Sequence, residues 1–158
     1  MSLVRFGRWT VRCDVGKTRA AYALTTGCAE QCGCTICKNF VAARDSVYPA
    51  EVKRLFEELG IDIQRESEVV HSHRIARGRH SYSGWFYLFG TIESGRDARV
   101  PRGDLFALEL EAAGDDFSLG FSPRAPSVRA AAPFDSGPIV QIDFAVIAPW
   151  VLAIDEPS

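Results

Sequence analysis

The sequence lacks any apolar run long enough to cross a membrane. A membrane-spanning helix needs about 20 apolar residues, and the longest apolar stretch, FAVIAPWVLAI at 144–154, is interrupted by Pro149. The opening residues carry arginines at positions 5, 8 and 12 and lack the apolar core of a secretory signal. We therefore expect a cytoplasmic protein that makes no contact with a membrane.

An excess of positive charge is also absent. The chain has 18 lysines and arginines against 20 acidic residues, which gives a net charge of -2. Proteins that bind phosphate backbones usually carry a basic face and a high isoelectric point. We therefore expect no binding to nucleic acid.

The familiar sequence motifs of enzymes are missing as well. There is no nucleophile elbow, no complete phosphate loop and no dinucleotide fingerprint. The GKT at 16–18 lacks the first glycine of a phosphate loop and follows Asp14, so we interpret it as a hairpin turn. The sequence consequently predicts neither a reaction nor a substrate, and it leaves the oligomeric state open.

What the sequence does contain is a cluster of cysteines. Four of the five cysteines lie in GCAEQCGCTICKNF at 27–40. Cytoplasmic thiols are kept reduced, so a dense cluster indicates metal binding or thiol chemistry before disulfides. Four thiolates are the usual ligands of a closed structural zinc site. We predict a metal site formed by Cys28, Cys32, Cys34 and Cys37. Zinc is the expected ion, because the C-x-C spacing is foreign to common iron–sulfur motifs.

Two alternatives to a metal site remain open. Cys37 falls in the first turn of a helix expected to begin at Thr35, where the helix dipole favours a thiolate. The cluster could therefore serve thiol redox chemistry with Cys37 as the reactive sulfur, or its members could simply pack as small apolar groups. Cys13 alternates with polar residues in a strand and is expected in the core. The two function hypotheses are a metal-stabilised binding or scaffold module and a thiol redox or iron–sulfur protein.

The three histidines surround a basic turn. His71, His73 and His80 flank the ARGRH sequence at 76–80. Residues two apart on a strand share a face, so His71 and His73 could together complete a metal site with three of the cysteines. The simpler interpretation is a solvated hairpin. A basic turn on an acidic protein could instead bind a small anionic ligand or a protein partner.

The length and the hydrophobic pattern predict a single α+β domain over residues 1–158. A short helix beginning at Thr35 is followed by a second over 49–60, whose apolar residues are spaced for one helix face. Residues 8–15 are expected to pair with a returning strand at 19–26, and residues from 67 onward read as strands. The prediction is a mainly antiparallel β sandwich or curled sheet with two short helices near 35–60.

Three finer expectations follow from the same pattern. Phe40 should pack on the sheet beside Trp85 or Phe89. The alternation in DLFALELE, at 104–111, predicts a strand that buries Phe106 and its apolar neighbours. Residues 122–138 hold four of the eight prolines and are expected to form a long loop.

The chain resembles a group of small uncharacterised bacterial proteins. The resemblance rests on CGCTICKNF at 32–40, on YPAEVKRLFEELGID at 48–62 and on GWFYLFG at 84–90. It implies a shared pattern of five positions, Cys32, Cys34, Cys37, Asn39 and Phe40. Cys28 lies outside that pattern, and the group brings no activity with it.

Overall fold

The computed structural model describes residues 1–124 and 132–158. Its main feature is a seven-stranded antiparallel sheet with the order β1-β2-β4-β9-β8-β7, in which β3 also pairs with β4, while β5 and β6 form a separate hairpin. The strands are β1 (Ser2–Phe6), β2 (Trp9–Cys13), β3 (Glu68–Ala76), β4 (Arg79–Ser94), β5 (Arg99–Arg102), β6 (Leu105–Leu108), β7 (Glu111–Ala112), β8 (Phe117–Arg124) and β9 (Ile139–Pro149). The helices are α1 (Val15–Tyr22), α2 (Cys28–Cys32), α3 (Thr35–Val47) and α4 (Ala50–Leu59). The predicted mixture of helices with a mostly antiparallel sheet is confirmed, whereas a sandwich of two sheets is not.

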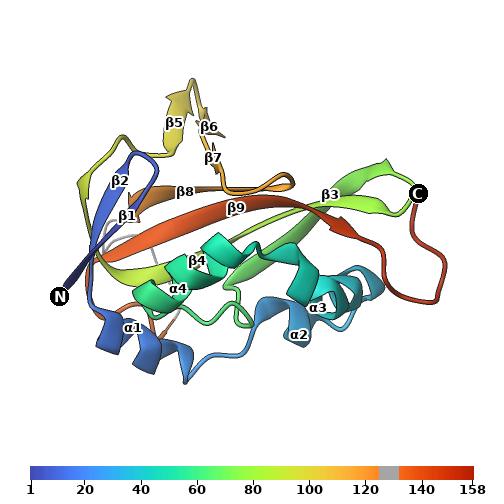
Figure 1. Ribbon diagram of the computed structural model, residues 1–158, viewed down its shortest axis with the longest axis horizontal. Coiled ribbons are helices and arrows are strands. Elements are labelled where there is room, and N and C mark those ends of the chain that lie inside the picture. The colour runs from blue at the N-terminus through green and yellow to red at the C-terminus, as the bar shows by residue number, and fades with distance from the viewer. Residues whose placement is uncertain (125–131) are drawn as a thin grey trace.

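The core lies between the sheet and the helices that run along one side of it (Figure 1). Helix α4 buries its apolar stripe as predicted, and the ring of Phe56 lies 4.8 Å from that of Phe86 on β4. Phe40 of α3 lies 5.2 Å from Tyr82. The prediction that Phe40 packs beside Trp85 or Phe89 is therefore wrong. Successive residues of a strand point to opposite faces, so the even-numbered residues of β4 meet the helices there.

The predicted returning strand at 19–26 is also wrong, because residues 15–22 form helix α1. Asp14 caps this helix by accepting a hydrogen bond from the Lys17 amide at 3.0 Å. The helix fills a gap beside β4, which pairs with β3 through its first half and with β2 through its second. In that gap the Tyr22 hydroxyl donates to the Tyr87 carbonyl at 2.7 Å, and the Thr18 hydroxyl accepts from the Phe89 amide. Helix α1 thus satisfies backbone groups that a strand partner would otherwise bind.

The β5–β6 hairpin projects from the sheet away from the helices (Figure 1). Its two strands pair only with each other, and Arg99 at its base lies 3.6 Å from Asp143 of β9. Leu105 and Phe106 lie near its tip and are exposed, at 77% and 53% of their surface. The prediction that Phe106 is buried is wrong for this reason.

The proline-rich segment is only partly a loop. Residues 122–124 belong to β8, and Phe134 is buried against Tyr22 and Phe89. Residues 125–131 of the predicted loop lie outside the described residues. Within the described ranges, the structure contains no helix with the length and apolar character needed to span a membrane.

Candidate metal centre

Three cysteines come together where α2 meets α3. Helix α2 ends at Cys32, Gly33 adopts a positive φ of 69°, and Cys34 is the N-cap of α3. A positive φ suits glycine, which has no Cβ to clash, and it turns the chain sharply between the two helices. The sulfur atoms of Cys32, Cys34 and Cys37 all lie within 4.8 Å of one another. The local sequence therefore gathers three ligand atoms of the kind that soft metal ions prefer.

The three thiols differ in their surroundings. Cys32 and Cys34 are exposed, whereas Cys37 is buried. The Cys34 sulfur accepts a hydrogen bond from the Cys37 amide at 3.4 Å and another from the Cys32 thiol at 3.2 Å. All five cysteines are free thiols, so no disulfide occupies the cluster. The arrangement can hold a metal ion.

Cys28 stands apart from the other three. Its thiol donates a hydrogen bond to Glu68 Oε1 on β3 at 3.2 Å. It lies one helical turn before Cys32 on α2, so the two side chains leave the same face of that helix. Burial raises the pKa of the Cys28 thiol, and the neighbouring Glu68 carboxylate raises it further. Its role as a fourth ligand stays a prediction.

The expected lowering of the Cys37 pKa by the start of the helix is not found. Burial raises the pKa of Cys37, and its two thiol neighbours raise it further. Instead, the hydrogen bond from the Cys37 amide lowers the pKa of Cys34. The free amides of a helix N-terminus point at the capping side chain, and here that side chain belongs to Cys34.

Asn39 fixes the start of α3 to the sheet and to the C-terminal segment. Its side-chain amide donates to the Pro149 carbonyl at 3.0 Å and to the Tyr82 hydroxyl at 3.3 Å, while its oxygen accepts from the Val151 amide. The Tyr82 hydroxyl donates in turn to the Ile36 carbonyl at 2.9 Å. Burial raises the pKa of Tyr82, and the nearby Cys37 and Cys34 thiols raise it further. Asn39 therefore positions the start of α3, a role that its place between Lys38 and Phe40 in the sequence does not indicate.

The histidines do not behave as a pair on one face. His71 lies opposite Tyr82 and His73 lies opposite Ser81, because β3 carries an extra residue between them. A bulge of this kind breaks the alternation of a strand, so His71 faces the helices and His73 faces the other side. The expectation that both rings share a face is wrong.

The sequence suggested a solvated hairpin, but His80 is not in contact with solvent. Its side chain is wholly buried, its Nδ1 lies 2.9 Å from His71 Nε2, and its Nε2 lies 2.8 Å from Glu156 Oε2. Arg74 and the Gly78 amide also bind the Glu156 carboxylate. No local sequence signal identifies Glu156, because it lies 76 residues from His80 along the chain.

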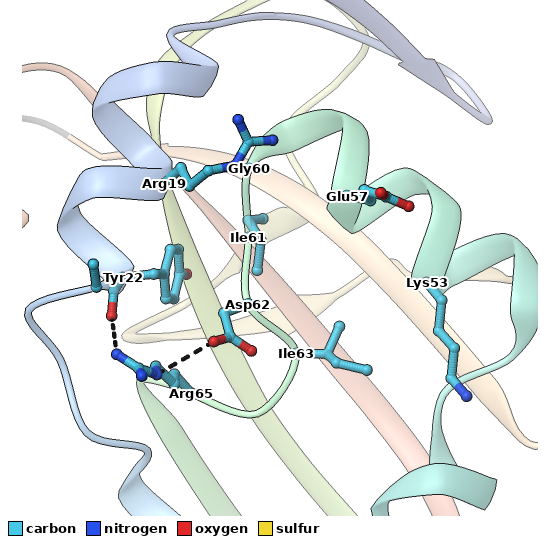
Figure 2. A pocket seen from close by; sticks show the side chains of 10 residues that line it. Arg19, Tyr22, Lys53, Glu57, Gly60, Ile61, Asp62, Ile63 and Arg65 are labelled. Atoms are coloured by element: carbon cyan, nitrogen blue, oxygen red, sulfur yellow. Dashed lines mark hydrogen bonds and ion pairs between the residues drawn. The ribbon is translucent and has the colours of Figure 1, made fainter.

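A cavity of about 550 Å³ lies between α1, α4 and the segment after α4 (Figure 2). Its polar side chains include Arg19, Lys53 and Arg65. Arg65 is already bound to the Tyr22 carbonyl and, at 3.2 Å, to Asp62 Oδ2. The residues that line the cavity include neither a cysteine nor a histidine.

The chain finds no match among protein-family models, curated proteins or solved structures. The resemblance to small bacterial proteins accordingly stays a prediction, and the function rests on the geometry of the site.

Proposed function

We propose that the protein is a metal-stabilised binding or scaffold module that holds one thiophilic ion, zinc foremost, through Cys32, Cys34 and Cys37. The observation that supports this proposal is the mutual distance of the three sulfurs, within 4.8 Å. Zinc–sulfur bonds are about 2.3 Å long, so sulfurs around one tetrahedral ion are separated by less than this limit. The fourth position is available to a further ligand, for which the sequence predicts Cys28.

The ion would fasten an otherwise weakly held segment. Cys32 ends a helix of five residues and Cys34 caps the start of α3, and an isolated helix of five residues is unstable in water. A metal ion that binds only the folded arrangement adds its binding free energy to the stability of the fold. We therefore assign the ion a structural role that positions α2 and α3 beside β3.

Metal content of the purified protein tests this proposal. Protein prepared with reduced thiols and without chelator should contain about one zinc per chain, the stoichiometry of a single structural site. Cys34→Ser should lose the ion, and Cys13→Ser, which removes the cysteine outside the cluster, should keep it. Less than about 0.2 metal ions per chain in the parent protein, far below that single-site stoichiometry, would contradict the proposal.

Thiol–disulfide exchange is a second candidate, favoured by the contrast between an exposed Cys34 of lowered pKa and a buried Cys37. The Cys34 thiolate would attack a disulfide of a partner molecule, which forms a mixed disulfide and releases one partner sulfur as a thiolate. The Cys37 thiol would then lose its proton and attack Cys34. That step releases the second partner thiolate and leaves a Cys34–Cys37 disulfide.

Alkylation at pH 6 distinguishes this second candidate. Iodoacetamide should modify Cys34 first and leave Cys13 unmodified, because only a thiolate reacts at a useful rate. Equal and slow modification of all five cysteines in metal-free protein would argue against redox chemistry.

A further inference from the structure

His71 and His80 form a chain of contacts that ends at the Glu156 carboxylate. The Glu156 carboxylate can only accept, so His80 Nε2 must carry a proton to hold the contact of 2.8 Å. His71 Nε2 lies 2.9 Å from His80 Nδ1, so this contact engages one ring nitrogen of His71. Its other ring nitrogen, Nδ1, has no hydrogen-bond partner among the described residues. A ring held in this way presents a nitrogen ligand.

The support behind His71 is rigid. His80 is fully buried, its ring lies 5.2 Å from that of Trp150, and both of its nitrogens are bound. Glu156 is itself fixed by Arg74 at 3.0 Å and by the Gly78 amide at 2.9 Å. Histidines that bind metal ions commonly donate their second N–H to a group that is held in place like this, which sets the tautomer and the direction of the ring.

The cysteine segment contacts strand β3 and its neighbour β4 at its two ends. At its beginning, the Cys28 thiol binds Glu68 of β3 at 3.2 Å. At its end, the Ile36 carbonyl accepts from the Tyr82 hydroxyl, and Tyr82 is the direct cross-strand partner of His71. The rings of His71 and Tyr82 lie 5.2 Å apart. His71 therefore occupies the position along β3 that matches the start of α3, on the face that the helices cover.

We infer that His71, through Nδ1, is the fourth ligand of the metal ion bound by Cys32, Cys34 and Cys37, an inference that rests on the proposed function. Three cysteines and one histidine form a recognised structural zinc site. Cys32 and Cys34 are exposed. The His71 nitrogens do not lie within 4.8 Å of all three sulfurs in this structure, so ion binding would have to draw these side chains together. Cys28 is the competing fourth ligand, and in this structure its thiol is engaged by Glu68 Oε1 at 3.2 Å. The ion would thus join the helices to strand β3.

Cobalt(II) titration of the full chain under reducing conditions, followed by competition with zinc, tests the inference. Absorption by the cobalt–sulfur bonds reports the number of thiolate ligands, and the visible bands report whether nitrogen is present. The parent protein and Cys28→Ser should show the same spectra and zinc affinities that agree within about twofold. His71→Asn should change the visible bands and weaken zinc binding by at least about tenfold, the lower limit found for supporting residues of metal sites.

Three further variants exclude a purely structural effect. His73→Asn, on the opposite face of β3, should leave the spectra and the affinity unchanged. Glu156→Gln should weaken zinc binding by about 10–100-fold while it leaves the cobalt–sulfur absorption intact, because it acts through His80. His71→Cys should restore binding with stronger cobalt–sulfur absorption, since it supplies a fourth thiolate at the same position.

The outcomes separate the two proposals. If the parent protein binds neither cobalt nor zinc, the proposed function fails. If it binds both and Cys28→Ser changes the spectra while His71→Asn does not, Cys28 is the fourth ligand and the inference about His71 is wrong. If neither variant changes the spectra, a solvent molecule completes the site and the inference is equally wrong.

Discussion

The two ends of helix α3 hold polar groups in opposite ways. Near its C-terminal end, Arg44 donates to both oxygens of Glu66, at 3.0 and 2.8 Å, and also binds Glu30. The Tyr48 hydroxyl donates to the same Glu66 carboxylate at 2.9 Å. At its N-terminal end, three thiols contact mainly one another, and two of them are exposed. In the ionic cluster near the C-terminal end, the Glu66 carboxylate is bound by Arg44 and Tyr48. The three sulfurs at the N-terminal end can still take a metal ion.

The difference between the two ends of α3 indicates which end could bind a ligand. A buried ionic cluster whose members satisfy one another fixes the packing of α3 and offers no free group to a ligand. Thiols gathered at the surface gain little from one another, because sulfur is a weak donor and acceptor. Their assembly is compatible with a bound metal ion. The following changes test that contrast, from the largest expected effect to the smallest.

Removing the guanidinium should produce the largest loss of stability. Arg44→Met leaves the Glu66 carboxylate, whose side chain has no exposed surface, without its cation. Breaking a buried ion pair at one partner costs about 3–5 kcal/mol. Urea unfolding of the two proteins measures this cost, and Arg54→Met on the exposed face of α4 is the matched control. A loss below about 1 kcal/mol, the usual value of a surface ion pair, would show that the cluster is not essential to the fold.

The thiol cluster should matter for stability only when metal is present. Zinc at a free concentration of 100 times its dissociation constant should raise the free energy of unfolding by about 2.7 kcal/mol. Cys34→Ser should abolish this increase and cost less than about 0.5 kcal/mol in metal-free protein, because the side chain is exposed. Melting curves with and without a strong chelator provide the measurement. An equal loss in both conditions would contradict the contrast between the two ends of α3.

The cysteine outside the cluster should show a smaller effect that does not depend on metal. The Cys13 thiol is buried and donates to the Leu59 carbonyl at 3.3 Å. A serine hydroxyl can donate to the same carbonyl, so Cys13→Ser should cost about 1 kcal/mol rather than the 2–3 kcal/mol of an unpaired polar group. Urea unfolding with and without zinc gives the comparison. A cost that changes with zinc would place Cys13 in the metal site.

The smallest effect concerns pH. Burial tends to raise the pKa of Glu30, but its hydrogen bond from Arg44 outweighs burial and holds the pKa below the ordinary value. A carboxyl with a lowered folded pKa stabilises the fold above its unfolded pKa, about 4.3, and loses that contribution as the pH falls through the folded pKa. Glu30→Gln should therefore cost up to about 1 kcal/mol at pH 7. The difference between variant and parent should disappear toward pH 3 in unfolding curves, and a difference that grows on acidification would reverse the assigned direction.

The sequence alone predicted the features that depend on residues close together along the chain. The apolar spacing of Val52, Leu55, Phe56 and Leu59 is set by the helix period, and Gly60 ends α4 with a φ of 80° as a glycine C-cap does. The C-x-C-x2-C spacing also sufficed to bring three sulfurs together, because one short turn joins them. Antiparallel pairing of β3 with β4 followed from the ARGRH turn.

Tertiary structure decided what depends on partners far away in the chain. Residues 15–22 became helical because Thr18 and Tyr22 satisfy backbone groups in a gap of the sheet that no local pattern announces. Phe106 is exposed because it lies near the tip of a hairpin that projects from the sheet, and strand alternation alone does not reveal which neighbours cover a side chain. A bulge between His71 and His73 turned the two rings to opposite faces. The contact of His80 with Glu156 joins residues 76 positions apart, and only the folded chain brings them within 2.8 Å.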